Sequence, residues 1–256
     1  MPRFRIDPKA IQNGKVFLNP KESHHAVSVL RVKTGDAVDL IDGEGNSFKG
    51  IVTIAHNSGL EVRVETKLNT KISSKDAPGS FRVTLAVSAI KTERMELLIQ
   101  KACELGVHEI IPMRSERSII KLSKERWQEK IKRWQKIASE SCKQCGLAAI
   151  PKISESVDFK DVFTGQRKFD GILIPTLSAT TKPLYDTLKK SPAGGLLVLI
   201  GPEGDFTKKE TELAVSHGAL PVSLGPLVLR TETAAIYVLS VINFFYREIE
   251  QVKENP

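Results

Sequence analysis

The chain has 256 residues, of which 41% are hydrophobic and 27% charged, and its formal net charge is +8 at pH 7. These are the proportions of a globular protein, and the length allows one large domain or two small ones. The three cysteines do not make a disulfide framework, and the sequence shows neither a secretory signal nor an apolar run long enough to span a membrane. We therefore expect a cytoplasmic protein without a membrane partner, and the positive charge favours a polyanionic partner such as a nucleic acid.

Residues 1–72 are predicted to form a small β-rich domain. Turn signals such as Asn13-Gly14 and Asp42-Gly43 separate short apolar runs. Strands this short and closely spaced indicate a small barrel. A stretch rich in Lys, Ser, Asp, Pro and Gly then predicts a linker. The strands are predicted at 16–18, 37–41, 47–55 and 60–64, a short helix at 23–32 and the linker at 71–80.

Residues 77–256 form a second predicted domain, in which strands alternate with helices. This alternation indicates a parallel α/β sheet. Pro112 is expected to end the second strand. Strands are predicted at 81–89, 109–111, 171–175, 196–200 and 219–224, and helices with apolar residues at every third or fourth position at 95–105 and 123–145.

Two further helices are predicted near the end of the chain. One begins at a capping box formed by Thr207 and Glu210 and stops at Gly218. The last runs from about 233 to 251, with Thr231 or Thr233 as its cap. Its first half is apolar on all sides, which requires burial on more than one side. We expect one side to meet the sheet and the other a second subunit; the alternative is a helix enclosed in one large core.

The predicted strands at 196–200 and 219–224 both end in loops rich in glycine and proline. In open α/β sheets, ligands bind outside the carboxyl ends of strands, so the two loops are expected to form one small-molecule pocket. The chain contains no P-loop, dinucleotide fingerprint, zinc-protease or nucleophile-elbow motif. This absence favours a ligand that backbone groups hold.

The cysteines and histidines do not predict a metal site. Cys142 and Cys145 form a single C-x-x-C pair, which cannot supply four zinc ligands, and Cys142 falls on the apolar stripe of its helix. Core packing is the expected role of Cys142. The adjacent His24 and His25 are expected to point to different sides of a helix and to serve at a surface or between domains.

Residues 114–143 contain ten basic and four acidic side chains. One interpretation is a solvated helix face with ion pairs between successive turns. The other is a track for the phosphates of a nucleic acid, which we favour slightly because the N-terminal segment is basic too.

Six segments together resemble a known family. In order along the chain they are residues 25–31 (HAVSVLR), 94–107 (RMELLIQKACELGV), 134–138 (WQKIA), 144–146 (QCG), 199–204 (LIGPEG) and 224–234 (LGPLVLRTETA). They are similar to the bacterial 16S rRNA uridine-N3 methyltransferases, RsmE, of the SPOUT superfamily, over nearly the whole chain.

The resemblance implies a PUA-like RNA-binding β-barrel at 1–72 and a SPOUT methyltransferase domain with a trefoil knot at 77–256. It also implies a homodimer that binds S-adenosylmethionine and methylates N3 of a uridine, conventionally numbered 1498, in 16S rRNA of the small ribosomal subunit. The residues expected to bind the cofactor are Thr176, Ile200, Gly201, Pro202, Gly204, Leu224, Gly225, Leu229, Thr233 and Ala234.

The same resemblance suggests roles for charged residues. Arg230 is expected to contact RNA or the uracil oxygens, and Glu232 to orient Arg230 or accept the N3 proton, with a simple helix-terminal ion pair as the alternative. Glu203 is expected to act at the same site or to orient its loop. The residues expected to contact RNA phosphates are Arg3, Arg31, Arg114 and Arg117.

The chain departs from the family pattern at three positions. Leu147 and Leu227 stand where arginines are common, and Asp205 stands where a glycine often completes the loop. Loss of two cations weakens the expected phosphate contacts, and Asp205 is expected to repel RNA or to narrow the loop. The core of the motifs is retained, so cofactor binding is still expected. Two other functions stay open: a SPOUT enzyme acting on another rRNA site or on tRNA, and an RNA-binding protein without catalysis.

Overall fold

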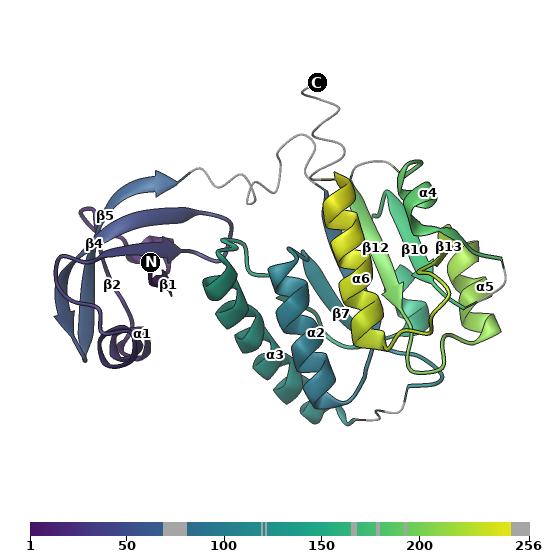
Figure 1. Ribbon diagram of the computed structural model, residues 1–256. Coiled ribbons are helices and arrows are strands. Elements are labelled where there is room, and N and C mark those ends of the chain that lie inside the picture. Colours follow the sequence, from purple (N-terminus) through teal and green to yellow (C-terminus); the bar gives the residue numbers. More distant parts are fainter. Residues whose placement is uncertain are drawn as a thin grey trace, which may run out of the picture. The chain divides into compact units, whose positions relative to one another are not determined.

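A computed structural model describes residues 1–68, 81–118, 120, 122–164, 168–177, 180–191 and 194–246 (Figure 1). The linker predicted at 71–80 lies outside the described residues. The chain divides into two compact units. The first comprises Met1–Ala77 and Ser139–Ile150, and the second comprises Pro78–Ala138 and Pro151–Pro256.

The described part of the first unit contains a five-stranded sheet that curls into a half-barrel (Figure 1). Its strand order is β1-β3-β4-β5-β2, with β1 parallel to β3 and the other pairs antiparallel. Buried apolar side chains from every strand fill its concave side. The strands are β1 (Arg3–Arg5), β2 (Lys15–Phe17), β3 (Ala37–Ile41), β4 (Ser47–His56) and β5 (Gly59–Leu68).

The helix predicted at 23–32 starts earlier than expected. A 3-10 turn, η1 (Pro8–Ala10), precedes it, and α1 (Pro20–His24) continues into a π-helical turn, η2 (His25–Val29). Asn19 caps α1 by accepting a hydrogen bond from the Glu22 amide at 2.9 Å, and a proline follows this cap. The helix ends before Arg31, whose φ of 56° is left-handed.

Residues 139–150 pack within this first unit, although the sequence analysis places them in the second domain. Arg3 Nη1 donates to the Lys143 carbonyl at 2.6 Å, and Lys143 Nζ pairs with Glu22 at 2.9 Å. The Ile150 amide donates to the Gly43 carbonyl at 2.9 Å. Hydrogen bonds and an ion pair therefore hold this segment to the N-terminal unit.

The described part of the second unit contains an eight-stranded sheet in which every pairing is parallel. The strand order is β11-β13-β10-β12-β6-β7-β8, and β9 also pairs with β7. The parallel α/β architecture predicted from the sequence is confirmed. The strands are β6 (Arg82–Ser88), β7 (Glu109–Arg114), β8 (Lys152–Ile153), β9 (Val157–Asp158), β10 (Gly171–Pro175), β11 (Lys182–Pro183), β12 (Gly195–Ile200) and β13 (Ala219–Ser223).

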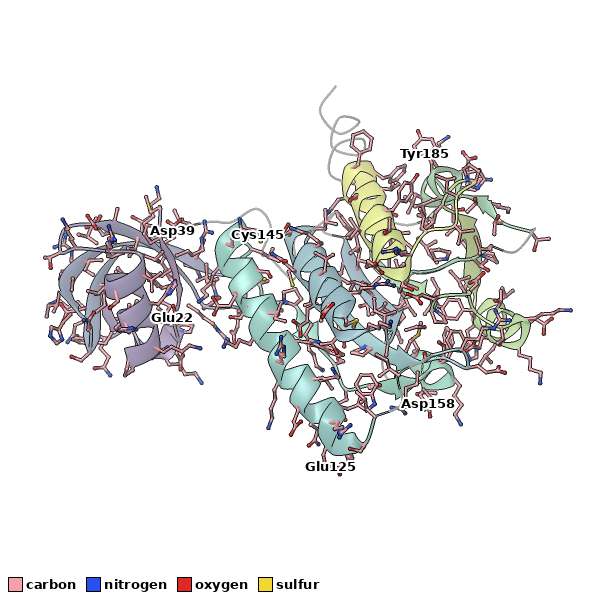
Figure 2. All side chains as sticks on the ribbon, turned by 60° about the horizontal axis from the view of Figure 1, so that its bottom comes forward. Glu22, Asp39, Glu125, Cys145, Asp158 and Tyr185 are labelled. Carbon is pink, nitrogen blue, oxygen red and sulfur yellow. The ribbon has the colours of Figure 1, made fainter. Side chains whose placement is uncertain are left out.

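Helices cover both faces of this sheet. On one face, Ala214, Phe159 and Val162 pack with Leu197 and Leu199 of β12. On the other, α6 contacts β6 and β12 and lies beside α2 (Figure 1). Figure 2 shows Tyr185 on α4 and Cys145 at the end of α3. The helices are α2 (Thr92–Glu104), α3 (Lys124–Cys145), η3 (Phe159–Phe163), α4 (Leu184–Leu188), α5 (Lys208–Ser216) and α6 (Thr231–Phe244).

Two predicted boundaries are wrong. Pro112 does not end its strand but lies inside β7, opposite Val87. On the side of β7 away from β6, β8 pairs with residues before Pro112 and β9 pairs with residues after it. No described strand on that side pairs with Pro112 itself, so the N–H that proline lacks is not needed for a ladder hydrogen bond. The last helix begins at Thr231, and neither Thr231 nor Thr233 caps it, because Arg230 occupies the cap position.

Other local predictions are confirmed. The capping box of α5 is present, with Thr207 and Glu210 bonded reciprocally, and Gly218 follows the helix with a φ of 88°. Cys142 is fully buried, as expected for a core residue.

Among the described residues, no helix combines the length and apolarity that crossing a membrane requires.

Candidate functional site

The carboxyl ends of three neighbouring strands meet at one edge of the parallel sheet. β10 lies between β12 and β13 and is parallel to both. The loops that leave these strands therefore emerge on the same side, where ligands bind in open α/β folds. Together with the start of α6, they enclose a cavity of about 270 Å³.

Nine of the ten residues expected to bind the cofactor line this cavity, and Thr233, exposed on α6, does not. The nine are Thr176, Ile200, Gly201, Pro202, Gly204, Leu224, Gly225, Leu229 and Ala234. The sequence signal for them is the pair of Gly/Pro loops after apolar strands. The lining residues that this reasoning did not assign to the cofactor are Pro175, Leu177, Thr181, Asp205, Ser223, Pro226, Leu227, Val228 and Thr231.

The loop backbone gives the cavity its form. Gly225 has a φ of 109° and Gly204 a φ of 100°, a region that residues with a Cβ rarely adopt. Thr231 Oγ1 donates to the Gly201 carbonyl at 3.0 Å, which ties the start of α6 to the end of β12. The lining is therefore mostly backbone and small or apolar side chains.

Asp205 binds two of the loops together. Its φ of 67° lies in the left-handed region. Glycine, which is common at this position in the family that the sequence resembles, adopts this region freely, whereas aspartate adopts it with some strain. Its carboxylate accepts hydrogen bonds from Thr176 Oγ1, the Leu177 amide and the Phe206 amide, each at 2.7 Å. The sequence suggested that Asp205 narrows the loop or repels RNA, and both stay predictions; the structure shows that Asp205 joins the β12 loop to the β10 loop.

A cluster of one arginine and two glutamates lies beside the cavity. Arg94, near the start of α2, pairs with Glu203 and with Glu232, the latter at 3.7 Å. The Glu232 side chain is only 10% exposed, and its Oε2 is buried without a hydrogen-bond partner. Sequence reasoning did not assign Arg94 a role, although the residue begins one of the six family segments.

Arg230 has a different environment from the one expected. Glu232 pairs with Arg94 and not with Arg230, so the alternative of a helix-terminal ion pair between Arg230 and Glu232 is not observed. Arg230 is exposed, and among the described residues no side chain forms an ion pair with it. Its guanidinium is therefore available at the edge of the site. Arg230, Glu203 and Glu232 adjoin the cavity but are not among its lining residues.

The four arginines predicted to bind RNA differ in availability. Arg31 is exposed. Arg3 is committed to the Lys143 carbonyl and to Asp39 within its unit. In the second unit, Arg114 Nε donates to Asp158 Oδ1 at 2.8 Å; Asp158 is labelled in Figure 2.

Arg117 is exposed and donates to the Gly204 carbonyl, which places this cation beside the cavity loop. Of the departures from the family pattern, Leu147 is buried in the first unit, whereas Leu227 is 73% exposed at the cavity. An apolar side chain thus stands at the cavity mouth where the family often has a cation.

The basic segment at 114–143 is partly neutralised. Lys130 Nζ donates to Thr92 Oγ1 at 2.7 Å, and Arg133 pairs with Glu96 at 2.6 Å. The Glu96 hydrogen bond and charge raise the pKa of Arg133. Some of these cations therefore serve contacts within the protein and others remain on the surface, and the phosphate track stays a prediction.

Comparisons with known proteins place this site in a class. The sequence profile of an RNA methyltransferase domain matches residues 77–243, and that of an RNA methyltransferase PUA domain matches residues 18–65. The fold and the strand-end cavity are thus those of an RNA methyltransferase.

Individual relatives narrow the class. Ribosomal RNA small subunit methyltransferase E of Mesomycoplasma hyopneumoniae is 30% identical over 94% of this chain and 98% of its own length. The enzyme of the same name from Neisseria gonorrhoeae, solved with S-adenosyl methionine, is 28% identical, with a TM-score of 0.83 over 96% of this chain and 98% of its own. A methyltransferase of Legionella pneumophila, solved with bound SAM, is 33% identical, with a TM-score of 0.79 over 94% of this chain and 96% of its own. The chain belongs to the ribosomal RNA small subunit methyltransferase E family.

Proposed function

We propose that the protein transfers a methyl group from S-adenosylmethionine to N3 of the uridine conventionally numbered 1498 in 16S rRNA. The observation that carries this proposal is the cavity at the ends of β10, β12 and β13, in a chain whose family acts on small-subunit ribosomal RNA. We place the reaction in the cytoplasm, where that RNA resides.

The cavity suits this cofactor chemically. Phosphate-bearing nucleotides call for cations or a glycine-rich phosphate cradle, and no lysine or arginine occurs among the described lining residues. Backbone groups of residues 200–204 and 224–229 offer the donors and acceptors that an adenine requires, and the apolar side chains cover its faces. The bound cofactor supplies an electrophilic methyl group.

The protein's own residues must position the uracil and remove the N3 proton. Arg230 is an exposed cation beside the cavity and is suited to hold a phosphate or to stabilise negative charge on the uracil oxygens. Glu232, whose side chain is 10% exposed beside the cavity, is a candidate proton acceptor, and Arg94 compensates the charge of this carboxylate.

The test uses the purified chain and three RNA substrates: assembled 30S subunits, naked 16S rRNA and tRNA. We expect methylation of one of the two 16S-containing substrates, and mass spectrometry of nuclease fragments should locate N3-methyluridine at the proposed position. Methylation of tRNA or of another rRNA site would favour a different SPOUT activity. Binding of RNA without methylation by any preparation would favour a non-catalytic protein.

Replacement of Arg230 by alanine is expected to spare cofactor affinity and to lower turnover by roughly tenfold or more, because one developing charge loses its partner. Since Arg230 is exposed, stability should change by about 0.5 kcal/mol or less. Calorimetric titration with S-adenosylmethionine and single-turnover methylation measure the two effects. Normal turnover would show that Arg230 has no such role.

We also propose that the enzyme is a homodimer and that its C-terminal loops form a trefoil knot, as in the family that the sequence resembles. Tyr237 and Phe244 are seven positions apart on one side of α6 and are 45% and 60% exposed. Leu97 of the neighbouring α2 is also 45% exposed. An apolar helix face of this kind is typical of a subunit interface.

Tyr237→Glu is expected to convert the dimer into a monomer, because it places a charge in the centre of this apolar face. Light scattering after size-exclusion chromatography measures the mass in solution. Val215→Glu is the matched control: Val215 is also 45% exposed but lies on α5. A Tyr237→Glu variant that keeps the wild-type mass would exclude this face as the interface.

A further inference from the structure

The lining of the cavity carries a single charge. Among its described lining residues, Asp205 alone is ionisable to a carboxylate or an ammonium at neutral pH; the others are apolar, hydroxyl-bearing or glycine. No described lysine or arginine forms an ion pair with Asp205. A ligand in this cavity therefore meets one uncompensated negative charge.

This carboxylate is held in a fixed position. Three donors, Thr176 Oγ1 and the amides of Leu177 and Phe206, bond to its two oxygens at 2.7 Å. All three donors are formally neutral, so they orient the group without cancelling its charge. Arg117 donates to the carbonyl of Gly204, the residue before Asp205, and not to the Asp205 carboxylate.

The loop itself does not require a negative charge. A φ of 67° is adopted by glycine at no cost and by asparagine readily. An asparagine side-chain oxygen would also accept a hydrogen bond from the neighbouring loop. Compared with asparagine, the carboxylate adds a second acceptor oxygen, which accepts a hydrogen bond from the Phe206 amide, and a negative charge.

We propose that Asp205 makes the cavity selective for the cationic cofactor over its neutral product. This inference rests on the proposed binding of S-adenosylmethionine in the cavity. Methyl transfer leaves the C–S electron pair on sulfur, forms the bond from N3 to carbon and releases the N3 proton. The ligand thereby loses its sulfonium charge and, with it, the Coulomb attraction to Asp205. Asp205 therefore strengthens binding of the cationic cofactor and adds no comparable attraction for the product.

The test compares wild type with Asp205→Asn, which keeps the turn and an acceptor but removes the charge. The ligands are S-adenosylmethionine, S-adenosylhomocysteine and the amine analogue sinefungin, which carries an ammonium in place of the sulfonium. In Asp205→Asn, we expect affinity for both cationic ligands to fall about tenfold and that for S-adenosylhomocysteine to change by about twofold or less. Added salt should reduce the ratio by which wild type prefers the cationic ligands over S-adenosylhomocysteine, and it should leave this ratio unchanged in Asp205→Asn.

Glu212→Gln is the control for net charge, since Glu212 is an exposed residue of α5 outside the cavity, and it should keep the wild-type preference. Asp205→Gly removes the strain of the left-handed backbone together with the charge. It should show the same ratio of affinities for cationic and neutral ligands as Asp205→Asn. Equal losses for all three ligands in Asp205→Asn would show that Asp205 acts only through the loop contact, and unchanged affinities would show that its charge has no role; either result overturns the inference. Wild-type cofactor affinity in Gly225→Val would instead contradict the proposed cavity itself.

Discussion

Replacing Gly225 with valine is expected to abolish detectable binding of S-adenosylmethionine, with a loss of roughly a hundredfold or more in affinity. Gly225 has a φ of 109°, which a β-branched residue does not tolerate without a change in the loop. A Cβ at this position would meet no atom within 4 Å, so the new side chain would project into open space at the cavity. Both effects act on the loop that follows β13. Calorimetric titration of the purified variant measures the loss.

Gly218→Val separates loss of the site from loss of the fold. Gly218 has a φ of 88°, and it too has no atom within 4 Å of its built Cβ, but it follows α5 and does not line the cavity. Each variant should lose about 1–3 kcal/mol of stability through backbone strain. Only Gly225→Val should lose the cofactor. Equal affinities in the two variants would place the cofactor elsewhere.

The sequence predicted the sheet because its strong signals are local. The apolar runs at β10 and β12 and the helical spacing in α2 and α3 are visible in short windows. The strands β1, β8, β9 and β11 are two or three residues long, too short for a periodicity, and exist because a neighbouring strand offers them hydrogen bonds. Pro112 illustrates the same limit, since its tolerance in β7 depends on where β8 and β9 stop.

The candidate site likewise has features that the sequence could predict and features that it could not. Its glycines and prolines are local signals, and the cavity that they predicted exists. The contacts between charged residues are not local. Arg94 meets Glu203 across 109 positions, and Asp205 meets Thr176 across 29. Such contacts follow from which strands are neighbours, and the order β10-β12-β6 cannot be read from a single sequence by periodicity.

The arginines predicted to contact RNA show a further limit of prediction from the sequence. Composition indicated a basic surface, but it did not distinguish Arg3 and Arg114, which are held by internal partners, from Arg31 and Arg117, which are exposed. A count of cations therefore overestimates the phosphate contacts that the protein offers.

Arg94→Met is expected to lower both stability and turnover. The variant leaves Glu232, whose side chain is 10% exposed, as a buried carboxylate without a cation, and it frees Glu203 in the cavity loop. Breaking a fully buried pair costs about 3–5 kcal/mol; because Arg94 is 31% exposed, we expect about 1–3 kcal/mol here. Turnover should fall by roughly tenfold, since the loop and the candidate proton acceptor both lose their support. Urea unfolding and single-turnover methylation measure the two quantities.

Arg133→Met provides the matched control, because Arg133 also pairs with a glutamate but is 66% exposed. It should cost about 1 kcal/mol or less and leave turnover unchanged. The double variant Arg94→Met/Glu232→Gln should regain part of the lost stability, since a neutral amide needs no cation, but it should not regain turnover if Glu232 accepts the N3 proton. Recovery of turnover in the double variant would show that Glu232 serves only to bind Arg94, and the proton acceptor would then have to be sought on the RNA or in the solvent.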